Sequence, residues 1–337
     1  MKLQIAFLLF CFTVFSRLNG QDIHFSQFQT ANTLFNPASN GFFNGDYRAM
    51  IIHRSQWKSV TVPFVTTGIT LDGKLLKMNE KKNSLNAGLN LYQDKAGDGA
   101  LQTIFLQFAP SYLLSVGGDS STFVSIGAGI GYLSKQVNFS KLTFDNQFDG
   151  ELFDASFANG EPIGNDKASA IDISAGINVL KRLKENFNIG FGIGAMHINQ
   201  PLLSFVKVGS VKYGQLLSAF LIADYGLSKQ LSIQPSITYA KQKSLTEIGA
   251  GSMLAYSLKY NKSGVQNLKC GVFYRIDDAI IIQAGAGYRN LNIGLSYDIN
   301  ISEFERATNK RGATEISLSY IFSKVKKIKP SAPCLIF

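Results

Sequence analysis

The sequence predicts an all-β fold, an antiparallel transmembrane β-barrel of the outer-membrane type with about 14 strands. Three observations predict it: an export signal opens the chain, apolar and polar residues alternate over long segments, and the connections between these segments sort by length. A tilted strand that crosses a membrane needs about 9–11 residues, and a closed sheet leaves no backbone group unpaired in lipid.

Residues 1–20 predict a removable signal peptide. Lys2 supplies the positive start, residues 5–15 form an apolar stretch, and the segment ends ahead of Gln21. The apolar stretch is too short for a membrane-spanning helix, which takes about 20 residues. A buried strand or a short anchor is the alternative. Cys11 lies inside the apolar stretch rather than at the cleavage point, so a lipid-modified cysteine is not expected.

The composition suits a barrel with lipid outside and water inside. Hydrophobic residues make up 45%, which excludes a disordered chain, and charged residues are 17%, where soluble domains carry about 25%. Removing Lys2 and Arg17 with the signal peptide lowers the formal net charge from +10 to +8. The basic residues lie mostly in predicted turns and near the C-terminus, without the stacking aromatics of a nucleic-acid site. We therefore expect a solvated basic rim facing anionic membrane surfaces, and no nucleic acid partner.

Alternation with a period of two recurs along the chain after residue 46. Ile171, Ile173 and Ile177, for example, alternate with polar or small residues. Successive strand residues point to opposite faces, so each segment has one apolar face, and many segments exceed the five or six residues usual in soluble sheets. The predicted strands are 47–57, 63–76, 84–92, 102–115, 122–134, 169–179, 186–197, 215–226, 230–240, 246–260, 266–275, 279–288, 291–300 and 313–322. Single-chain bacterial barrels have an even number of strands, as predicted here.

The predicted connections differ in length between the two ends of the barrel. With both chain ends in the periplasm, the periplasmic connections are short: 77–83, 116–121, 180–185, 227–229, 261–265 and 289–290. The long connections, 135–168, 198–214 and 301–312, all fall on the outer side, as is typical of these barrels. The predicted parts are a signal peptide (1–20), a periplasmic N-terminal segment (21–46), the barrel (47–322) and a basic periplasmic tail (323–337). We expect the tail either to meet anionic lipid headgroups or to dock to a periplasmic protein.

Several short motifs follow one another in a fixed order. Residues 21–28 read Gln-Asp-Ile-His-Phe-Ser-Gln-Phe, and the later motifs are Asn36-Pro37-Ala38, Arg54-Ser55-Gln56-Trp57, Gly271-Val272-Phe273-Tyr274-Arg275, Tyr297-Asp298-Ile299-Asn300 and residues 312–320. With these motifs the chain resembles the PorP/SprF family of outer-membrane proteins, part of the type IX secretion and gliding machinery of Bacteroidetes. Two departures affect the ends: Ile23 replaces the family's more frequent Pro, and Pro333-Cys334-Leu335 replaces a Cys-Pro-x-Phe ending.

The resemblance implies an outer-membrane component that supports secretion or surface anchoring of an adhesin-like partner protein through protein–protein contact. The chain ends would engage periplasmic secretion components, outer loops would hold the cargo, and gliding motility is an associated process. The candidate residues are Phe25, Ser26, Gln27, Asn36, Pro37, Arg54, Gln56, Trp57, Tyr297, Asp298, Asn300, Glu315 and Cys334. The main alternative is an uptake channel for small or hydrophobic molecules, similar in shape to fatty-acid transporters. A secreted soluble β-sandwich adhesin is a third possibility.

The predicted outer loop 135–168 interleaves acidic residues with phenylalanines. Exposed aromatics are favoured anchors at protein interfaces, so the loop is a candidate partner contact. Its candidate residues are Phe144, Phe148, Phe153 and Phe157. The alternative is a solvated loop that partly plugs the barrel. The acidic residues from Asp145 to Glu151 form an incomplete calcium-ligand pattern.

No motif in the sequence argues for catalysis, a metal or a cofactor. The glycine runs 127–131 and 190–194 have the spacing G-x-G-x-G inside strands, which favours small lumen-facing positions over a nucleotide loop. His24, His53 and His197 are scattered, so we expect structural or rim histidines and not a zinc site. Trp57 is a candidate interface anchor at the membrane boundary. Whether Cys270 on a strand pairs with Cys334 in the tail stays open.

Overall fold

A computed structural model describes residues 22–60, 62–78, 83–117, 121–206, 211–258 and 265–323. The predictions of a signal peptide at 1–20, of a role for the tail after residue 323, and of a part for Cys334 therefore concern residues outside the described ones. Among the described residues no helix is both long and apolar enough to cross a membrane.

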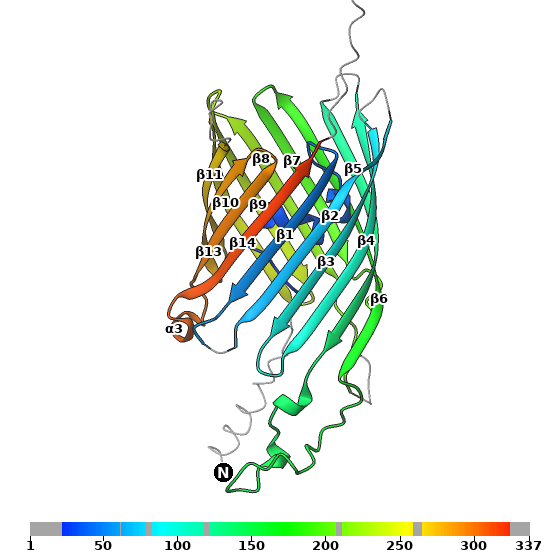
Figure 1. Ribbon diagram of the computed structural model, residues 1–337, viewed down its shortest axis with the longest axis vertical. Coiled ribbons are helices and arrows are strands. Elements are labelled where there is room, and N and C mark those ends of the chain that lie inside the picture. The colour runs from blue at the N-terminus through cyan, green and yellow to red at the C-terminus, as the bar shows by residue number, and fades with distance from the viewer. Residues whose placement is uncertain are drawn as a thin grey trace, which may run out of the picture.

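Fourteen antiparallel strands form one closed barrel, in which each strand pairs with its neighbours in the sequence and β1 pairs with β14 (Figure 1). The strands are β1 (Tyr47–Gln56), β2 (Phe64–Met78), β3 (Asn83–Ala96), β4 (Leu101–Val116), β5 (Thr122–Gln136), β6 (Lys167–Lys184), β7 (Phe187–Met196), β8 (Leu216–Gly226), β9 (Leu231–Gln242), β10 (Leu245–Ser257), β11 (Val265–Arg275), β12 (Ala279–Tyr288), β13 (Leu291–Asn300) and β14 (Arg311–Phe322). The predicted number of strands is confirmed. The predicted strands are too short at β3 and β6. Both strands continue in the sheet past the predicted ends, residues 92 and 179, into polar sequence.

The connections sort by length as predicted. The connections 137–166, 197–215 and 301–310 lie at one end of the barrel, which we call the long-loop end. The opposite end, called the short-turn end, carries connections such as 185–186 and 289–290. In Figure 1 the long-loop end lies at the bottom.

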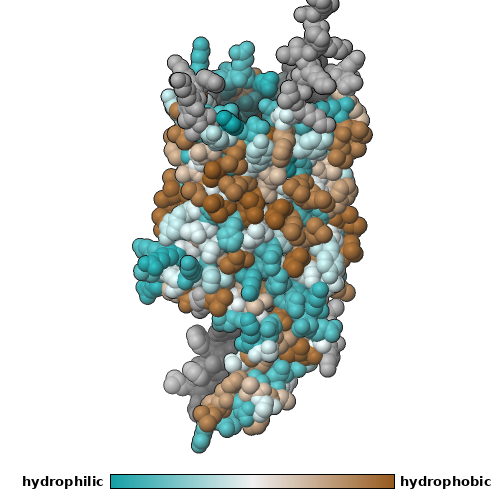
Figure 2. All heavy atoms as spheres, in the orientation of Figure 1, coloured by the Kyte–Doolittle hydropathy of each residue, from teal (hydrophilic) through white to brown (hydrophobic). Residues whose placement is uncertain are grey.

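The strands place apolar side chains outside and polar side chains inside. In β5, Ile126 and Ile130 are 54% and 57% exposed, whereas Ser125 between two outward neighbours is fully buried. On the face shown in Figure 2, the outward residues form a hydrophobic band across the middle of the barrel, with more hydrophilic surface towards both ends. Cys270 is exposed on this outer face, between the exposed Leu268 and Val272. A sandwich core would bury such residues, so the band indicates a lipid-facing surface.

Residues 22–46, called the lumenal segment, lie inside the barrel (dark blue in Figure 1). The prediction of a separate periplasmic segment at 21–46 is therefore wrong about its place. The segment begins beside Gln242 at the long-loop end, where Asp22 N donates to Gln242 Oε1 at 2.6 Å. It ends at the short-turn end, where Asp46 N donates to Phe322 O at 2.9 Å. The polar inner wall supplies partners for a chain that has no strand neighbours of its own, which is why this polar sequence is buried.

The lumenal segment folds into three short helical pieces: α2 (Phe28–Ala31), η1 (Asn32–Leu34) and η2 (Pro37–Ser39). Asn36 caps the last of these, because its side chain accepts a hydrogen bond from Ala38 N at 2.9 Å and Pro37 occupies the first helical position. Such tight turns pack about 25 residues into the lumen without forming a fifteenth strand.

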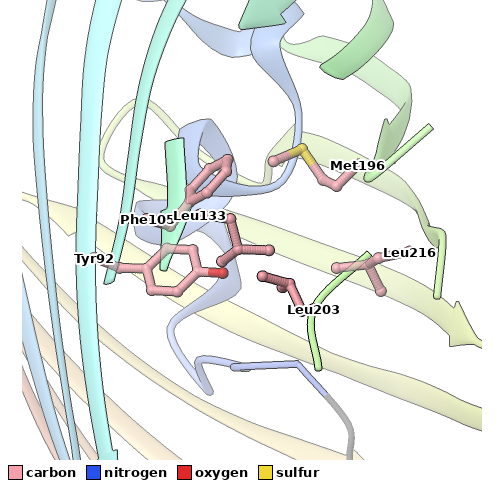
Figure 3. Close-up of a cluster of buried hydrophobic side chains, with 6 residues drawn as sticks. All are labelled: Tyr92, Phe105, Leu133, Met196, Leu203 and Leu216. Atoms are coloured by element: carbon pink, nitrogen blue, oxygen red, sulfur yellow. The ribbon is translucent and has the colours of Figure 1, made fainter. Parts of the chain in front are cut away.

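An apolar cluster inside the barrel surrounds the start of the lumenal segment (Figure 3). Its buried members come from five strands and from the connection 197–215; they are Tyr92, Phe105, Leu133, Met196, Leu203 and Leu216. Ile23 and Phe35 of the segment pack against them. Burial of apolar area against this cluster stabilises the position of the segment in addition to its polar contacts.

Candidate functional site

The structure brings together four of the residues that the family resemblance singles out. Ser26 of the lumenal segment, Arg54 of β1, Asp298 of β13 and Glu315 of β14 meet in the lumen near the long-loop end, together with Arg275 at the end of β11. These five residues, called the Arg54 cluster, are all at most 7% exposed. Motifs separated by more than 200 residues thus form one buried site.

The ion pairs of the Arg54 cluster join residues that all belong to strands of the barrel. Arg54 Nη1 donates to Glu315 Oε1 at 2.6 Å and to Asp298 Oδ2 at 3.1 Å. Arg275 Nη2 donates to the same Asp298 oxygen at 2.9 Å and also pairs with Asp278. Buried charges need such pairing, because an unpaired one pays the full desolvation penalty. Arg54 and Glu315 face each other across the β1–β14 pair that closes the barrel.

The lumenal segment adds neutral groups to this cluster. Ser26 N and Gln27 N donate to the two oxygens of Glu315 at 2.6 and 2.9 Å. Ser26 Oγ donates to Asp298 Oδ2 at 2.7 Å, and Gln283 Nε2 of β12 donates to Ser26 O at 2.7 Å. The wall therefore holds this part of the segment largely through its main chain.

A second site holds the start of the lumenal segment. Asp22 Oδ2 lies 2.7 Å from His197 Nε2, and the other ring nitrogen lies 2.6 Å from Asp172 Oδ1 of β6. Tyr92 OH also donates to Asp22 Oδ1, at 3.2 Å. We call Asp22, His197 and Asp172 the His197 clasp; all three are at most 8% exposed.

Charge pairing sets the ionisation of the His197 clasp. Burial alone lowers the pKa of His197, but hydrogen bonds and attraction from Asp172 and Asp22 outweigh it and raise this pKa to about 9. Burial raises the pKa of Asp22, yet the hydrogen bond and charge of His197 leave it below its ordinary value. At neutral pH His197 is therefore an imidazolium that is hydrogen-bonded to Asp172 of the wall and to Asp22 of the segment.

A third set of contacts follows residues 35–41 of the segment along β4 to β7. Asn36 Nδ2 donates to Asn178 Oδ1 at 2.8 Å, and Ser125 Oγ donates to Ala38 O at 2.8 Å. Gly127 faces the lumen here, and a Cβ at this position would lie 2.5 Å from Ala38 N. Gly127, Gly129 and Gly131 are buried on the inner face, as expected of lumen-facing positions, and a side chain at Gly127 would displace the segment.

The opposite side of the lumen leaves a cavity of about 80 Å³ between the segment and β8 to β12. Phe25, Phe28 and Phe35 line it from the segment, and Phe273 and Ile281 from the wall. Within the part of the chain that the structure describes, no group of three or more histidine, cysteine or acidic side chains is arranged to hold a metal ion.

The connection 137–166 extends away from the barrel at the long-loop end (Figure 1). Its tip is a tight turn in which Asp149 Oδ1 accepts from the amides of Glu151 and Leu152, at 2.8 and 2.7 Å, and these bonds lower the pKa of Asp149. Among the predicted contact residues, Phe148, Phe153 and Phe157 are 46–55% exposed, whereas Phe144 is half-buried. Together with Leu152, the three exposed phenylalanines form what we call the loop-tip patch.

The remaining predicted residues lie apart from the Arg54 cluster. Trp57 packs at the rim against Phe64 and Phe304, with ring centroids 5.0 and 5.9 Å away. Tyr297 is 41% exposed on the outer face, and Asn300 shapes the connection 301–310 by donating to Thr308 Oγ1 at 2.9 Å.

The other members of the predicted set are structural neighbours of the segment or of the barrel seam. Phe25 is buried with Leu34 and Ile52, and Pro37 is buried in η2. Gln56 ends β1 opposite Ala313 of β14.

Sequence reasoning missed three residues that hold the lumenal segment: Asp172, His197 and Gln242. His197 was expected to be a structural or rim histidine, and the structure makes it a buried partner of two carboxylates. A charged residue such as Asp172 on the polar face of a long apolar strand is the signal that was available, because a barrel interior buries a charge only with a partner.

The barrel is similar in fold to solved outer-membrane channels. It matches the CymD monoaromatic hydrocarbon channel at 12% identity and a TM-score of 0.52, over 88% of this chain and 93% of that chain. The Ralstonia pickettii toluene transporter TbuX matches at 11% identity and 0.50, over 87% and 94%, and a Pseudomonas aeruginosa FadL homologue at 11% and 0.51, over 85% and 93%. No curated protein matches the chain.

A comparison with protein-family models agrees with the motifs and with the barrel fold. The model of the family described as type IX secretion system membrane protein PorP/SprF matches residues 18–320, which is most of the chain. The chain therefore belongs to the PorP/SprF family, and it is an outer-membrane β-barrel with a role in type IX secretion.

Proposed function

We propose that this barrel supports the secretion or surface retention of a partner protein through contacts at its long-loop end. The observation that carries the proposal is the contrast between the filled lumen and the exposed loop-tip patch. The lumen holds the chain's own residues 22–46, whereas the loop-tip patch projects exposed phenylalanines beyond the barrel. Aromatic side chains exposed on a shaped loop are typical anchors of protein interfaces.

The long-loop end faces outwards in this proposal, because long connections of outer-membrane barrels are extracellular. An adhesin-like partner would then meet the loop-tip patch at the cell surface, and gliding would depend on which partner is held. We further propose that the protein acts without catalysis, since the buried carboxylates of the Arg54 cluster and the His197 clasp are engaged by arginine or histidine.

The first test is a surface proteome of cells that lack the gene, compared with the parent and with a complemented strain. We expect the loss of one or a few large surface proteins while other outer-membrane barrels keep their levels. An unchanged surface proteome would contradict the proposal.

The second test addresses the loop-tip patch directly. We expect the triple variant Phe148→Ala, Phe153→Ala, Phe157→Ala to assemble normally and to lose retention of the affected surface protein. The matched control is Phe304→Ala, which removes a phenylalanine 63% exposed on a different connection at the same end. Equal retention in the triple variant and the control would sink the contact role of the loop.

An uptake channel for small or hydrophobic molecules is the second candidate. It is favoured by the apolar cavity beside the lumenal segment and by the fold shared with barrels named as hydrocarbon and toluene transporters. Uptake of a radiolabelled monoaromatic hydrocarbon by mutant and complemented cells separates the two. Loss of uptake with an intact surface proteome would favour the channel, and the reverse result favours secretion.

A further inference from the structure

Besides contacting segment side chains such as those of Asp22 and Asn36, the inner wall of the barrel binds the lumenal segment at main-chain atoms. Side chains from six different strands make these contacts; they are Asp72, Ser111, Ser125, Gln242, Gln283 and Glu315. The distances between donor and acceptor run from 2.6 to 2.8 Å. Contacts to peptide amides and carbonyls are open to any polypeptide, whereas the side-chain contacts favour particular residues.

Two glycines of the wall clear a path for this main chain. A Cβ at Gly127 would lie 2.5 Å from Ala38 N, and a Cβ at Gly194 would lie 2.3 Å from Phe35 O. Both neighbours are backbone atoms, so their side chains do not determine the fit. Gly88, Gly176 and Gly294 make room instead for segment side chains, those of Asn40, Asn36 and Gln27, so the path suits a segment with side chains of this kind at these positions.

The charges of the Arg54 cluster are balanced without the segment. Arg54 pairs with Glu315 and Asp298, and Arg275 pairs with Asp298, all within the wall. The segment contributes hydroxyl and amide groups there and the ring of His24, whose Nε2 lies 3.1 Å from Arg54 Nη2; water can replace each of these neutral groups. Withdrawal of the segment would therefore leave these buried charges paired, which is the condition for a ligand that exchanges.

The segment makes a short ionic contact at its first described residue. Asp22 enters the His197 clasp, where the cation belongs to the wall. A ligand for this wall is thus a polypeptide with a carboxylate side chain near the long-loop end, followed by neutral hydrogen-bonding side chains and by apolar side chains like those of Phe25, Leu34 and Phe35.

We propose that the inner wall is a polypeptide-binding site whose resident ligand is residues 22–41 and whose alternative ligand is a segment of a partner polypeptide with this chemistry. The inference goes beyond the proposed function: it concerns what the lumen binds, and it holds whether or not the loop-tip patch contacts cargo.

Thr33 and Thr70 provide the test, because their hydroxyl oxygens lie 3.0 Å apart and join the segment to β2. A synthetic peptide of residues 22–42 carries Thr33→Cys, activated as a mixed disulfide with thionitrobenzoate. The receptor is the full chain in outer-membrane vesicles, with Cys270→Ser, Cys334→Ser and Thr70→Cys. The thiol introduced at position 70 attacks the mixed disulfide of the peptide. A disulfide then links peptide and receptor, and thionitrobenzoate is released.

The resident segment must compete with the added peptide. Asp22→Asn with Ser26→Ala in the receptor removes its clasp and cluster contacts, so we expect the adduct yield to rise about tenfold. A receptor with Leu71→Cys in place of Thr70→Cys is the matched control, because Leu71 is the next residue and is 53% exposed on the outer face. A scrambled peptide controls for composition.

Four results decide the proposal. A peptide adduct confined to position 70 and increased by weakening the segment supports it. Yields at position 70 no greater than at position 71, or no greater than with the scrambled peptide, overturn it. Equal yields with and without the weakened segment exclude competition and also overturn it. A full chain with Thr33→Cys and Thr70→Cys must close its own disulfide when an added oxidant such as copper phenanthroline takes up the two electrons, and failure to do so would place the segment elsewhere.

Discussion

The Arg54 cluster and the His197 clasp are both buried sets of charges in the lumen, but they divide their charges differently. In the Arg54 cluster every arginine and carboxylate comes from the wall, and the Arg54–Glu315 pair joins the first strand to the last. In the His197 clasp one carboxylate comes from the lumenal segment. The difference indicates that the cluster stabilises the closed barrel, whereas the clasp holds the segment in place.

Breaking the Arg54 cluster should have the largest effect. Arg54→Met leaves Glu315 buried without its cation, and removing one partner of a buried pair costs about 3–5 kcal/mol. We expect impaired barrel closure, measured as loss of the heat-modifiable folded band and a lower denaturant midpoint. The double variant Arg54→Met, Glu315→Met should regain part of the loss, and an Arg54→Met barrel as stable as wild type would contradict the role assigned to the pair.

The contribution of the His197 clasp to stability should depend on pH. Because the pKa of His197 is raised to about 9, its contribution is complete below pH 6.5 and is lost as the pH rises through 9. Because the pKa of Asp22 is lowered, its contribution is present above pH 3.8 and is lost as the pH falls through its folded value.

The measurement for the clasp is the difference in free energy of unfolding between wild type and His197→Gln as a function of pH. The shift from 6.5 to about 9 corresponds to about 3 kcal/mol at most. We expect the difference to be largest near pH 6 and to shrink by pH 10. A difference that stays constant over this range would separate the clasp from the ionisation of His197.

A side chain added at Gly127 should displace the lumenal segment without preventing the barrel from forming. Gly127→Ala forces Ala38 away from β5 and costs about 1–3 kcal/mol, as overpacking does. Gly285→Ala is the matched control, since its Cβ would meet no atom closer than 3.1 Å. Protease cleavage within residues 22–46 of the folded barrel reports release of the segment, and equal protection in both variants would refute the close approach.

The loop-tip patch should have the smallest effect on stability. Its phenylalanines are about half exposed, so the triple alanine variant should change the free energy of unfolding by no more than about 0.5 kcal/mol. Denaturant midpoints measure this change. A large loss would mean that the patch packs against the barrel and is not free for a partner.

The strands could be predicted from the sequence because lipid dictates their pattern. Ile126 and Ile130 must be apolar to face the membrane, and the polar residues between them face the lumen, so the period of two survives along the whole barrel. The contents of the lumen leave no such pattern. Ser26 meets Glu315 across 289 positions, and nothing in the local sequence of either residue names the other.

The sequence therefore predicted residues of the candidate site but not how they are arranged in space. The family motifs pointed to Ser26, Arg54, Asp298 and Glu315, and the structure joins them in one cluster. Their common position inside the barrel, with the segment threaded through it, follows from long-range contacts that alternation does not encode.

An even number of strands returns the chain to the side on which it started, so the barrel alone would put both chain ends on one face. The lumenal segment adds a further crossing that pairs with no strand: Asp22 lies at the long-loop end, and Ser323 follows Phe322 at the short-turn end. A reporter placed directly ahead of Asp22 and one placed after Ser323 would consequently label opposite sides of the membrane. The number of strands sets on which side the barrel begins and ends. The path of residues 22–46 sets on which side Asp22 lies.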